Sequence, residues 1–171
     1  MKKLLFLIAV GMFLLPEISF AKLDNALTID PIGYIMQDRI GLKYEKMLKR
    51  SSSFTAEVLY DNTCNNTNGF GIGASYRRYF RTIIPVKTAG VEGFSIGPYA
   101  KAIWLNTDDK VNKSKNEAGF DIGAEIAYKV ILWQNFAVEP IIRANIGFGP
   151  AAYSNKDGFN VWPGIAIGFA W

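Results

Sequence analysis

Histidine is absent from the 171 residues, and cysteine occurs once, as Cys64. Without histidine there can be no Ser-His-Asp triad, no Cys-His pair and no zinc or haem bound through histidine. One cysteine also excludes an intramolecular disulfide framework and a cysteine metal cluster. We therefore assign no catalytic, cofactor-binding or metal-binding residues, and we expect neither a cofactor nor an enzymatic activity.

Charge is also sparse. Charged residues make up 20% of the chain, against about 25% in soluble domains. The formal net charge is only +4, and the basic residues do not gather into the stripe that a phosphate backbone requires. Nucleic acid is therefore not an expected partner. Half of the residues are hydrophobic and 14% are aromatic, which argues against disorder.

A leader precedes the rest of the chain. Lys2 and Lys3 are followed by an uncharged run from Leu4 to Pro16, and then by Ser19-Phe20-Ala21. This order predicts a secretory signal peptide over residues 1–21. The apolar run is too short for a membrane helix, which needs about 20 residues. Residues 22–171 would then form the exported protein.

From Ala26 onward the dominant pattern is alternation, which is the side-chain period of a β-strand. In residues 118–130 one face carries only apolar side chains, while the other carries charges and small residues. Six further runs share this pattern: 40–47, 54–60, 70–77, 94–104, 136–148 and 159–171. An eighth run, roughly Ala26 to Ile35, is weakly patterned and is interrupted by Asp30-Pro31.

Alternation alone does not say which face is the core, but the aromatic residues favour an outward apolar face. They bound the apolar face at both ends of most runs: Phe54 and Tyr60, Phe70 and Tyr76, Phe94 and Trp104, Phe120 and Tyr128, Phe136 and Phe148, Phe159 and Trp171. Membrane interfaces select aromatic side chains at the two rims of an apolar band. Ordinary β-propensity explains aromatic residues in strands, but not their position at strand ends.

The opposite face carries five basic and five acidic residues. They are Lys43, Glu45, Glu57, Arg77, Lys101, Asp121, Glu125, Lys129, Glu139 and Arg143. Charges inside a narrow barrel must be paired, because an unpaired buried charge costs several kcal/mol. The balance predicts a charge network in a barrel lumen. On a soluble protein the same residues would be a solvated face.

The connections alternate in length as well. Those around 61–69, 106–117 and 149–158 are long and hydrophilic, whereas those around 49–52 and 131–135 are short. Outer-membrane barrels have long external loops and short periplasmic turns. The connection from Phe80 to Gly93 departs from this rule because it is long.

The chain finishes on Ile165, Ile167, Phe169 and Trp171, which alternate up to a terminal aromatic residue. This motif resembles the C-terminal signature through which the barrel-assembly machinery recognises its clients. Residues 22–171 as a whole resemble the small eight-stranded bacterial outer-membrane barrels, the group that includes outer membrane proteins A, X and W. The resemblance implies contact with the bilayer, with lipopolysaccharide and, during biogenesis, with that machinery.

We therefore predict an all-β fold, a closed antiparallel transmembrane β-barrel of eight strands in the bacterial outer membrane. An eight-stranded barrel is just wide enough for its side chains to fill. The expected role is that of a monomeric, non-enzymatic barrel that presents external loops for adhesion or envelope integrity. Two alternatives stay open: a narrow, porin-like channel or carrier for small hydrophobic solutes, and a soluble exported lipocalin-like barrel.

Overall fold

The computed structural model describes residues 23–31, 39–61, 67–80, 90–107, 115–149 and 158–171. Eight strands account for most of them. Their bounds are β1 Asn25–Ile29, β2 Arg39–Lys49, β3 Ser52–Asp61, β4 Thr67–Tyr79, β5 Gly93–Thr107, β6 Lys115–Leu132, β7 Phe136–Phe148 and β8 Phe159–Ala170. The predicted signal peptide, Cys64 and much of the long connections lie outside the described residues.

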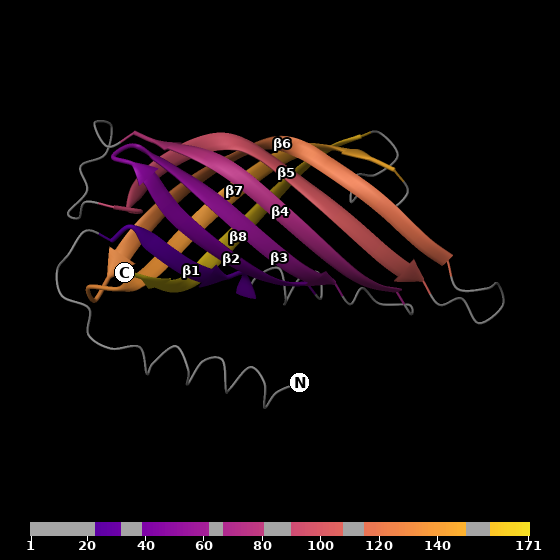
Figure 1. The fold of residues 1–171 in the computed structure, drawn as a ribbon, viewed down its shortest axis with the longest axis horizontal. Helices are drawn as coiled ribbons and strands as arrows, with labels where there is room; N and C mark the ends of the chain where they lie inside the picture. The colour runs from indigo at the N-terminus through magenta and orange to yellow at the C-terminus, as the bar shows by residue number, and fades with distance from the viewer. Residues whose placement is uncertain (1–22, 32–38, 62–66, 81–89, 108–114, 150–157) are drawn as a thin grey trace, which may run out of the picture.

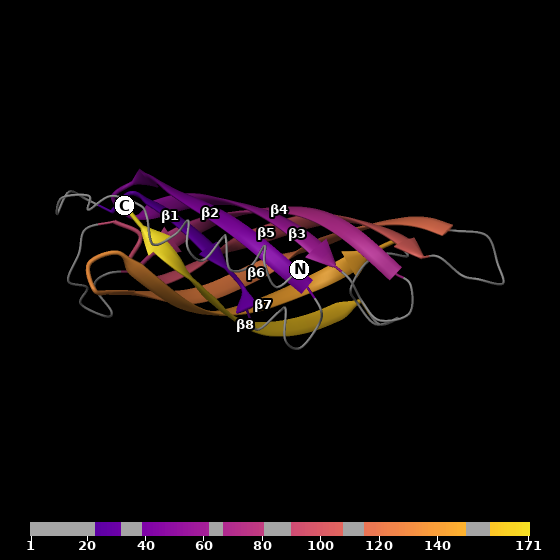
Figure 2. The same cartoon turned by 90° about the horizontal axis from the view of Figure 1, so that it is seen from below.

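The strands form one closed antiparallel barrel in which each strand pairs with its neighbours in sequence and β1 pairs with β8. Figures 1 and 2 show the tilted strands winding around a single axis. Closure removes the exposed edges that an open sheet would present. The predicted fold class and strand number are thus confirmed.

The first strand is shorter than the sequence pattern indicated. β1 ends at Ile29, not near Ile35, and it pairs with β8 only through residues 26–29. Asp30 and Pro31 follow directly. Proline has no backbone N–H for the ladder, so the Asp30-Pro31 step terminates the strand instead of interrupting it.

The pairing register fixes the width of the barrel. Followed from strand to strand, Leu27 leads through Tyr44 and its successive partners to Phe159 on β8. Leu27 itself pairs with Phe169, ten residues further along β8. Such a stagger in a closed eight-stranded sheet requires strands tilted by roughly 35–45° and leaves an interior that side chains fill.

The two ends of the barrel differ. One end, which we call the turn end, carries the β2–β3, β4–β5 and β6–β7 connections together with Leu23 and Trp171. The opposite loop end carries the connections β1–β2, β3–β4, β5–β6 and β7–β8. The segment from Phe80 to Gly93 therefore belongs to the turn end, although it is long.

The apolar face of the strands points outward. Many large apolar side chains on the outer surface of the strands are between 38% and 63% exposed, as with Leu42, Val58, Ile72, Ile126 and Phe159. The residues between them point inward and are buried. In the part of the chain that the structure describes, no helix is long and apolar enough to cross a membrane.

Candidate functional site

The barrel interior contains all ten residues of the predicted charge network. Nine of them are classed as buried, and Arg143 is half-buried. The alternating pattern explains this placement, because residues two apart on a strand point to the same face of the sheet. Every one of the ten makes an ion pair inside the barrel.

The larger group of ion pairs surrounds Arg77 on β4. Its Nη1 lies 2.8 Å from Glu139 Oε1 and 3.2 Å from Glu45 Oε2, and its Nε lies 2.6 Å from Glu125 Oε1. Lys129 pairs with Glu45 and, at 2.8 Å, with Glu139. The strands β2, β4, β6 and β7 are thus joined across the lumen and not only through their backbone ladders.

Hydroxyl groups add hydrogen bonds to two carboxylates of this group, Glu45 and Glu125. Ser53 Oγ and Tyr79 OH donate to Glu45 Oε1 at 2.5 and 2.6 Å, and Ser75 donates to Glu125. A buried ion pair repays its desolvation only when such additional hydrogen bonds are present. The interior near the turn end is therefore a filled, polar and internally compensated core.

A second group lies closer to the loop end. The guanidinium of Arg143 holds Glu57 through two nitrogens, at 2.7 and 3.1 Å, and its Nε reaches Glu125 at 3.1 Å. Lys101 Nζ lies 3.3 Å from Asp121. Because Glu125 contacts both Arg77 and Arg143, it connects the two groups.

An apolar cluster closes the turn end beneath the ion pairs. Leu23, Ala26, Met47, Tyr79, Val91 and Ala170 pack together there. Leu23 and Gly90 form a parallel bridge, and Val91 donates its N–H to the carbonyl of Leu23 at 2.8 Å. The Tyr79 hydroxyl also lies 3.2 Å from the Val91 carbonyl, so it links this plug to the charge network.

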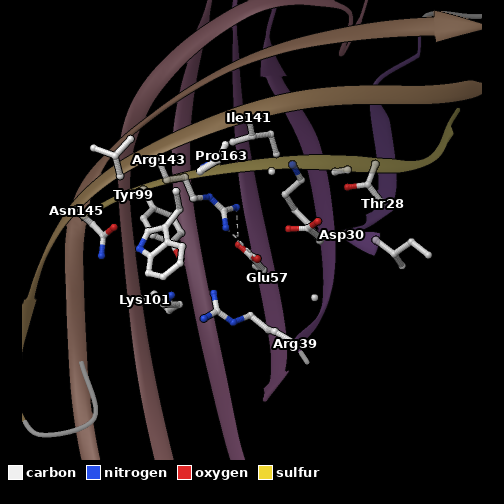
Figure 3. A pocket seen from close by; sticks show the side chains of 17 residues that line it. Thr28, Asp30, Arg39, Glu57, Tyr99, Lys101, Ile141, Arg143, Asn145 and Pro163 are labelled. Carbon is white, nitrogen blue, oxygen red and sulfur yellow. Dashed lines mark hydrogen bonds and ion pairs between the residues drawn. The ribbon is translucent and has the colours of Figure 1, made fainter. Parts of the chain in front are cut away.

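A cavity of about 270 Å³ occupies the loop end of the interior. Figure 3 shows Tyr99, Lys101, Arg143 and Asn145 on one side of it and Thr28 and Asp30 on the other, while the guanidinium of Arg39 extends toward Lys101. The Arg143–Glu57 pair lines it as well. Trp162 on β8 is also a lining residue.

Comparison with known proteins gives one structural likeness. No protein-family model and no curated protein matches the chain. The structure is similar to the crystal structure of the N-terminal β-barrel domain of Pseudomonas aeruginosa OprF. The TM-score is 0.49 and the sequence identity 14%, over 86% of this chain and 94% of that one.

The four residues predicted as an assembly signal lie on and just after β8. Ile167 and Phe169 pair with Ile29 and Leu27 across the closing seam. Trp171 exchanges two backbone hydrogen bonds of 2.9 Å with Asn25, and its ring lies 6.4 Å from that of Tyr44. These residues therefore close the barrel, and recognition by an assembly machinery stays a prediction.

Sequence reasoning missed the residues that complete the interior. Ser75 and Tyr79 each lie two residues from Arg77, and Ser53 lies four residues from Glu57, on the same inner face, so the alternation contained their signal. Leu23 and Val91 lie outside the strands and carried none. Thr28 and Asn145 were detectable only as inward positions on β1 and β7.

The arrangement favours packing over chemistry. Each inward carboxylate of the network pairs with a cation, and this includes Asp121, Glu125 and Glu139. Among the described residues, no group of histidine, cysteine, aspartate or glutamate side chains has the arrangement of a metal site.

Proposed function

We propose that this chain is a non-enzymatic integral β-barrel of the bacterial outer membrane, exported through the signal peptide of residues 1–21. Its interior is closed, and it acts through its external loops and its barrel body, as an adhesive or envelope-stabilising protein. Lipid, lipopolysaccharide and, during biogenesis, the assembly machinery are its proposed partners.

The inverted polarity of the barrel carries this proposal. Neighbouring residues on β6 illustrate it, since Ile126 is 41% exposed whereas Glu125 is 1% exposed. A soluble monomer avoids contiguous apolar patches beyond a few hundred Å², yet here apolar residues cover the outside of several strands in succession. A hydrocarbon environment is the solvent that suits such a surface.

Aromatic residues support the same environment. Tyr60, Phe70 and Trp104 are consecutive register partners near the loop end, and the rings of Phe70 and Trp104 stack at 6.3 Å. At the turn end Phe136 contacts both Trp133 and Phe169 with ring centroids 5.9 Å apart. Two aromatic rims on either side of an aliphatic band are typical of barrels in a bilayer.

The interior supports a closed barrel more than a channel. The Arg77 group fills the lumen between four strands, and the apolar plug lies below it. An ion would have to displace paired charges to pass, at a cost of several kcal/mol.

Membrane insertion is tested on cells that express the protein. We expect it to remain in the membrane fraction after alkaline carbonate extraction. Its gel mobility should also change on boiling, because a folded barrel resists detergent. Release into the supernatant would instead indicate a soluble lipocalin-like barrel and would refute the membrane proposal.

Closure is tested separately in planar bilayers. We expect no reproducible single-channel openings from purified, folded protein, with a general porin as a positive control. Regular openings that vanish after boiling would favour the narrow-channel alternative and would contradict the closed interior.

The loop role is tested by deleting the gene and measuring surface attachment and sensitivity to detergent. Complementation with a variant shortened within 62–66 and 108–114 separates adhesion through the loops from envelope stabilisation by the barrel body. Restored detergent resistance without attachment would support adhesion through the loops, whereas full restoration of both would place the function in the barrel body.

A further inference from the structure

The cavity at the loop end has features that a merely structural barrel does not need. Its walls come from β1, β2, β3, β5, β7 and β8, so most of the barrel contributes to one space of about 270 Å³. Nearer the turn end, the lumen holds the Arg77 ion pairs and the apolar plug. A space of this size accommodates a small organic molecule, near the lower end of ligand pockets.

Two hydroxyl groups in this cavity are buried without a hydrogen-bond partner. Thr28 is 1% exposed and Tyr99 is 4% exposed, and neither side-chain oxygen makes a hydrogen bond. Both residues line the cavity. Buried polar groups are almost always satisfied, so two orphan hydroxyls on residues that line one cavity indicate that a polar occupant belongs there.

Positive charge predominates on the cavity wall. Arg39, Lys43, Lys101 and Arg143 line it, against the two carboxylates Asp30 and Glu57. Both oxygens of Glu57 are held by Arg143. The partners of Lys101 and Lys43, namely Asp121 and Glu139, do not line the cavity. Four cations against two carboxylates make the charged lining of the cavity net positive.

Aromatic rings provide an apolar wall beside these cations. Trp162 stands on an inner face of β8 whose other positions are Asn160, Gly164, Ala166, Gly168 and Ala170. Arg39 lies 5.8 Å from the Trp162 ring centroid, and Arg143 lies 4.6 Å from that of Tyr99. Flat rings with charged groups at their faces suit a ligand that is itself flat and polar at one end.

We propose that this cavity binds a small carboxylate with a flat apolar body, an aromatic monocarboxylate being the simplest member of the class. The carboxylate lies on the side of Tyr99 and Lys101, where it accepts a hydrogen bond from the Tyr99 hydroxyl, with Lys101 and Arg39 supplying positive charge. The apolar body lies against Trp162 and Ile141. The site is internal, so it does not depend on the membrane location proposed above.

The experiment measures binding of benzoate to the folded protein in detergent micelles by isothermal titration calorimetry, with micelles alone as a blank. Benzyl alcohol and benzamidinium serve as neutral and cationic probes of the same shape. We expect benzoate to bind at least about tenfold more tightly than either, as charge-assisted hydrogen bonds require. Equal binding of all three probes, preference for benzamidinium, or no binding of benzoate would overturn the proposal.

Variants locate the site. Tyr99→Phe should weaken benzoate binding by roughly tenfold, since it removes one hydrogen bond to a charged acceptor. Thr28→Val, across the cavity, should change the affinity less. Tyr60→Phe is the matched control, because Tyr60 is 47% exposed on the outer surface. The mobility shift on boiling confirms that each variant is folded. Unchanged affinity in folded Tyr99→Phe would place benzoate elsewhere and refute the assignment.

Discussion

Arg77 shows how the interior depends on a single side chain. It is fully buried and contacts three carboxylates, on β2, β6 and β7. None of these strands is paired with β4. The guanidinium therefore connects parts of the barrel that the backbone ladder leaves unconnected, and its planar fork is suited to several carboxylates at once.

Replacing Arg77 with methionine should destabilise the folded barrel by about 3–5 kcal/mol, because it leaves buried carboxylates without their cation. The neighbouring Arg78→Met variant is the control, since Arg78 points outward and is exposed. Urea unfolding in detergent micelles measures both. Equal stability of the two variants would show that the Arg77 network does not hold the interior together.

The inward positions of the charges could be predicted from the sequence, but their partners could not. Alternation is a local property, and it placed Glu125 and Arg143 on inner faces. Pairing across the lumen depends on the stagger of the whole barrel, which joins Lys43 to Glu139 over 96 positions. The cavity was not predictable for the same reason, because it arises where inward side chains from distant strands leave space.

At the level of the strands, inward glycines mark places where two backbones come close. A Cβ on Gly123 of β6 would overlap the backbone of Ala144 and Asn145 on β7. The same holds for Gly97 against Tyr76 and for Gly168 against Leu27. Such positions admit no side chain, and they allow the sheet to bend into a narrow barrel.

Gly123→Ala should therefore cost about 1–3 kcal/mol of stability, as expected for overpacking against backbone. Gly73→Ala is the matched control on another strand. Its added Cβ would lie 3.4 Å or more from its neighbours, an ordinary contact. Urea unfolding should show little change or a slight gain for Gly73→Ala. A loss as large as that of Gly123→Ala would refute the close-approach explanation.

The sequence predicted strand boundaries correctly where the alternation was strong and incorrectly where it was weak. The bounds of β7, Phe136–Phe148, coincide with the alternating run. The weak pattern predicted that the first strand continues to Ile35, but β1 ends at Ile29. The length of the alternating run could not locate the end of β1, because a proline removes a hydrogen bond from the ladder and can end a strand while the alternation continues.

For the whole molecule, the outer surface decides the environment. Ile126 lies on the outer face of β6 between Ala124 and Tyr128. Ile126→Arg should destabilise the inserted barrel by about 2–4 kcal/mol if this face meets the middle of the bilayer. Asn116→Arg, near the loop end of the same strand, should cost at most about 1 kcal/mol. Refolding into liposomes at increasing urea measures the difference, and equal costs would contradict a lipid-facing surface.

Orientation in the membrane gives a further prediction. The loop end should face the outside, because long connections are external in outer-membrane barrels. In a Cys64→Ser background, Asn116→Cys at the loop end should react with an impermeant maleimide on intact cells. Gln134→Cys in the β6–β7 turn should react only after the cells are lysed. The reverse labelling pattern would invert the proposed topology.

The pairing of β1 with β8 ties completion of the structure to its last residues. Asn25 bonds to Trp171, 146 positions away, and the ion pairs of Arg77 and Glu139 span 62 positions. Until β1 pairs with β8, the sheet is not closed and its ten inward charges are not yet enclosed in one lumen. In the proposed membrane location, an incomplete sheet would therefore expose unpaired charges to lipid, which is unfavourable in free energy, whereas the closed barrel encloses them. Insertion should then proceed as one late, cooperative event, slow in the manner of folds whose contacts are distant along the chain.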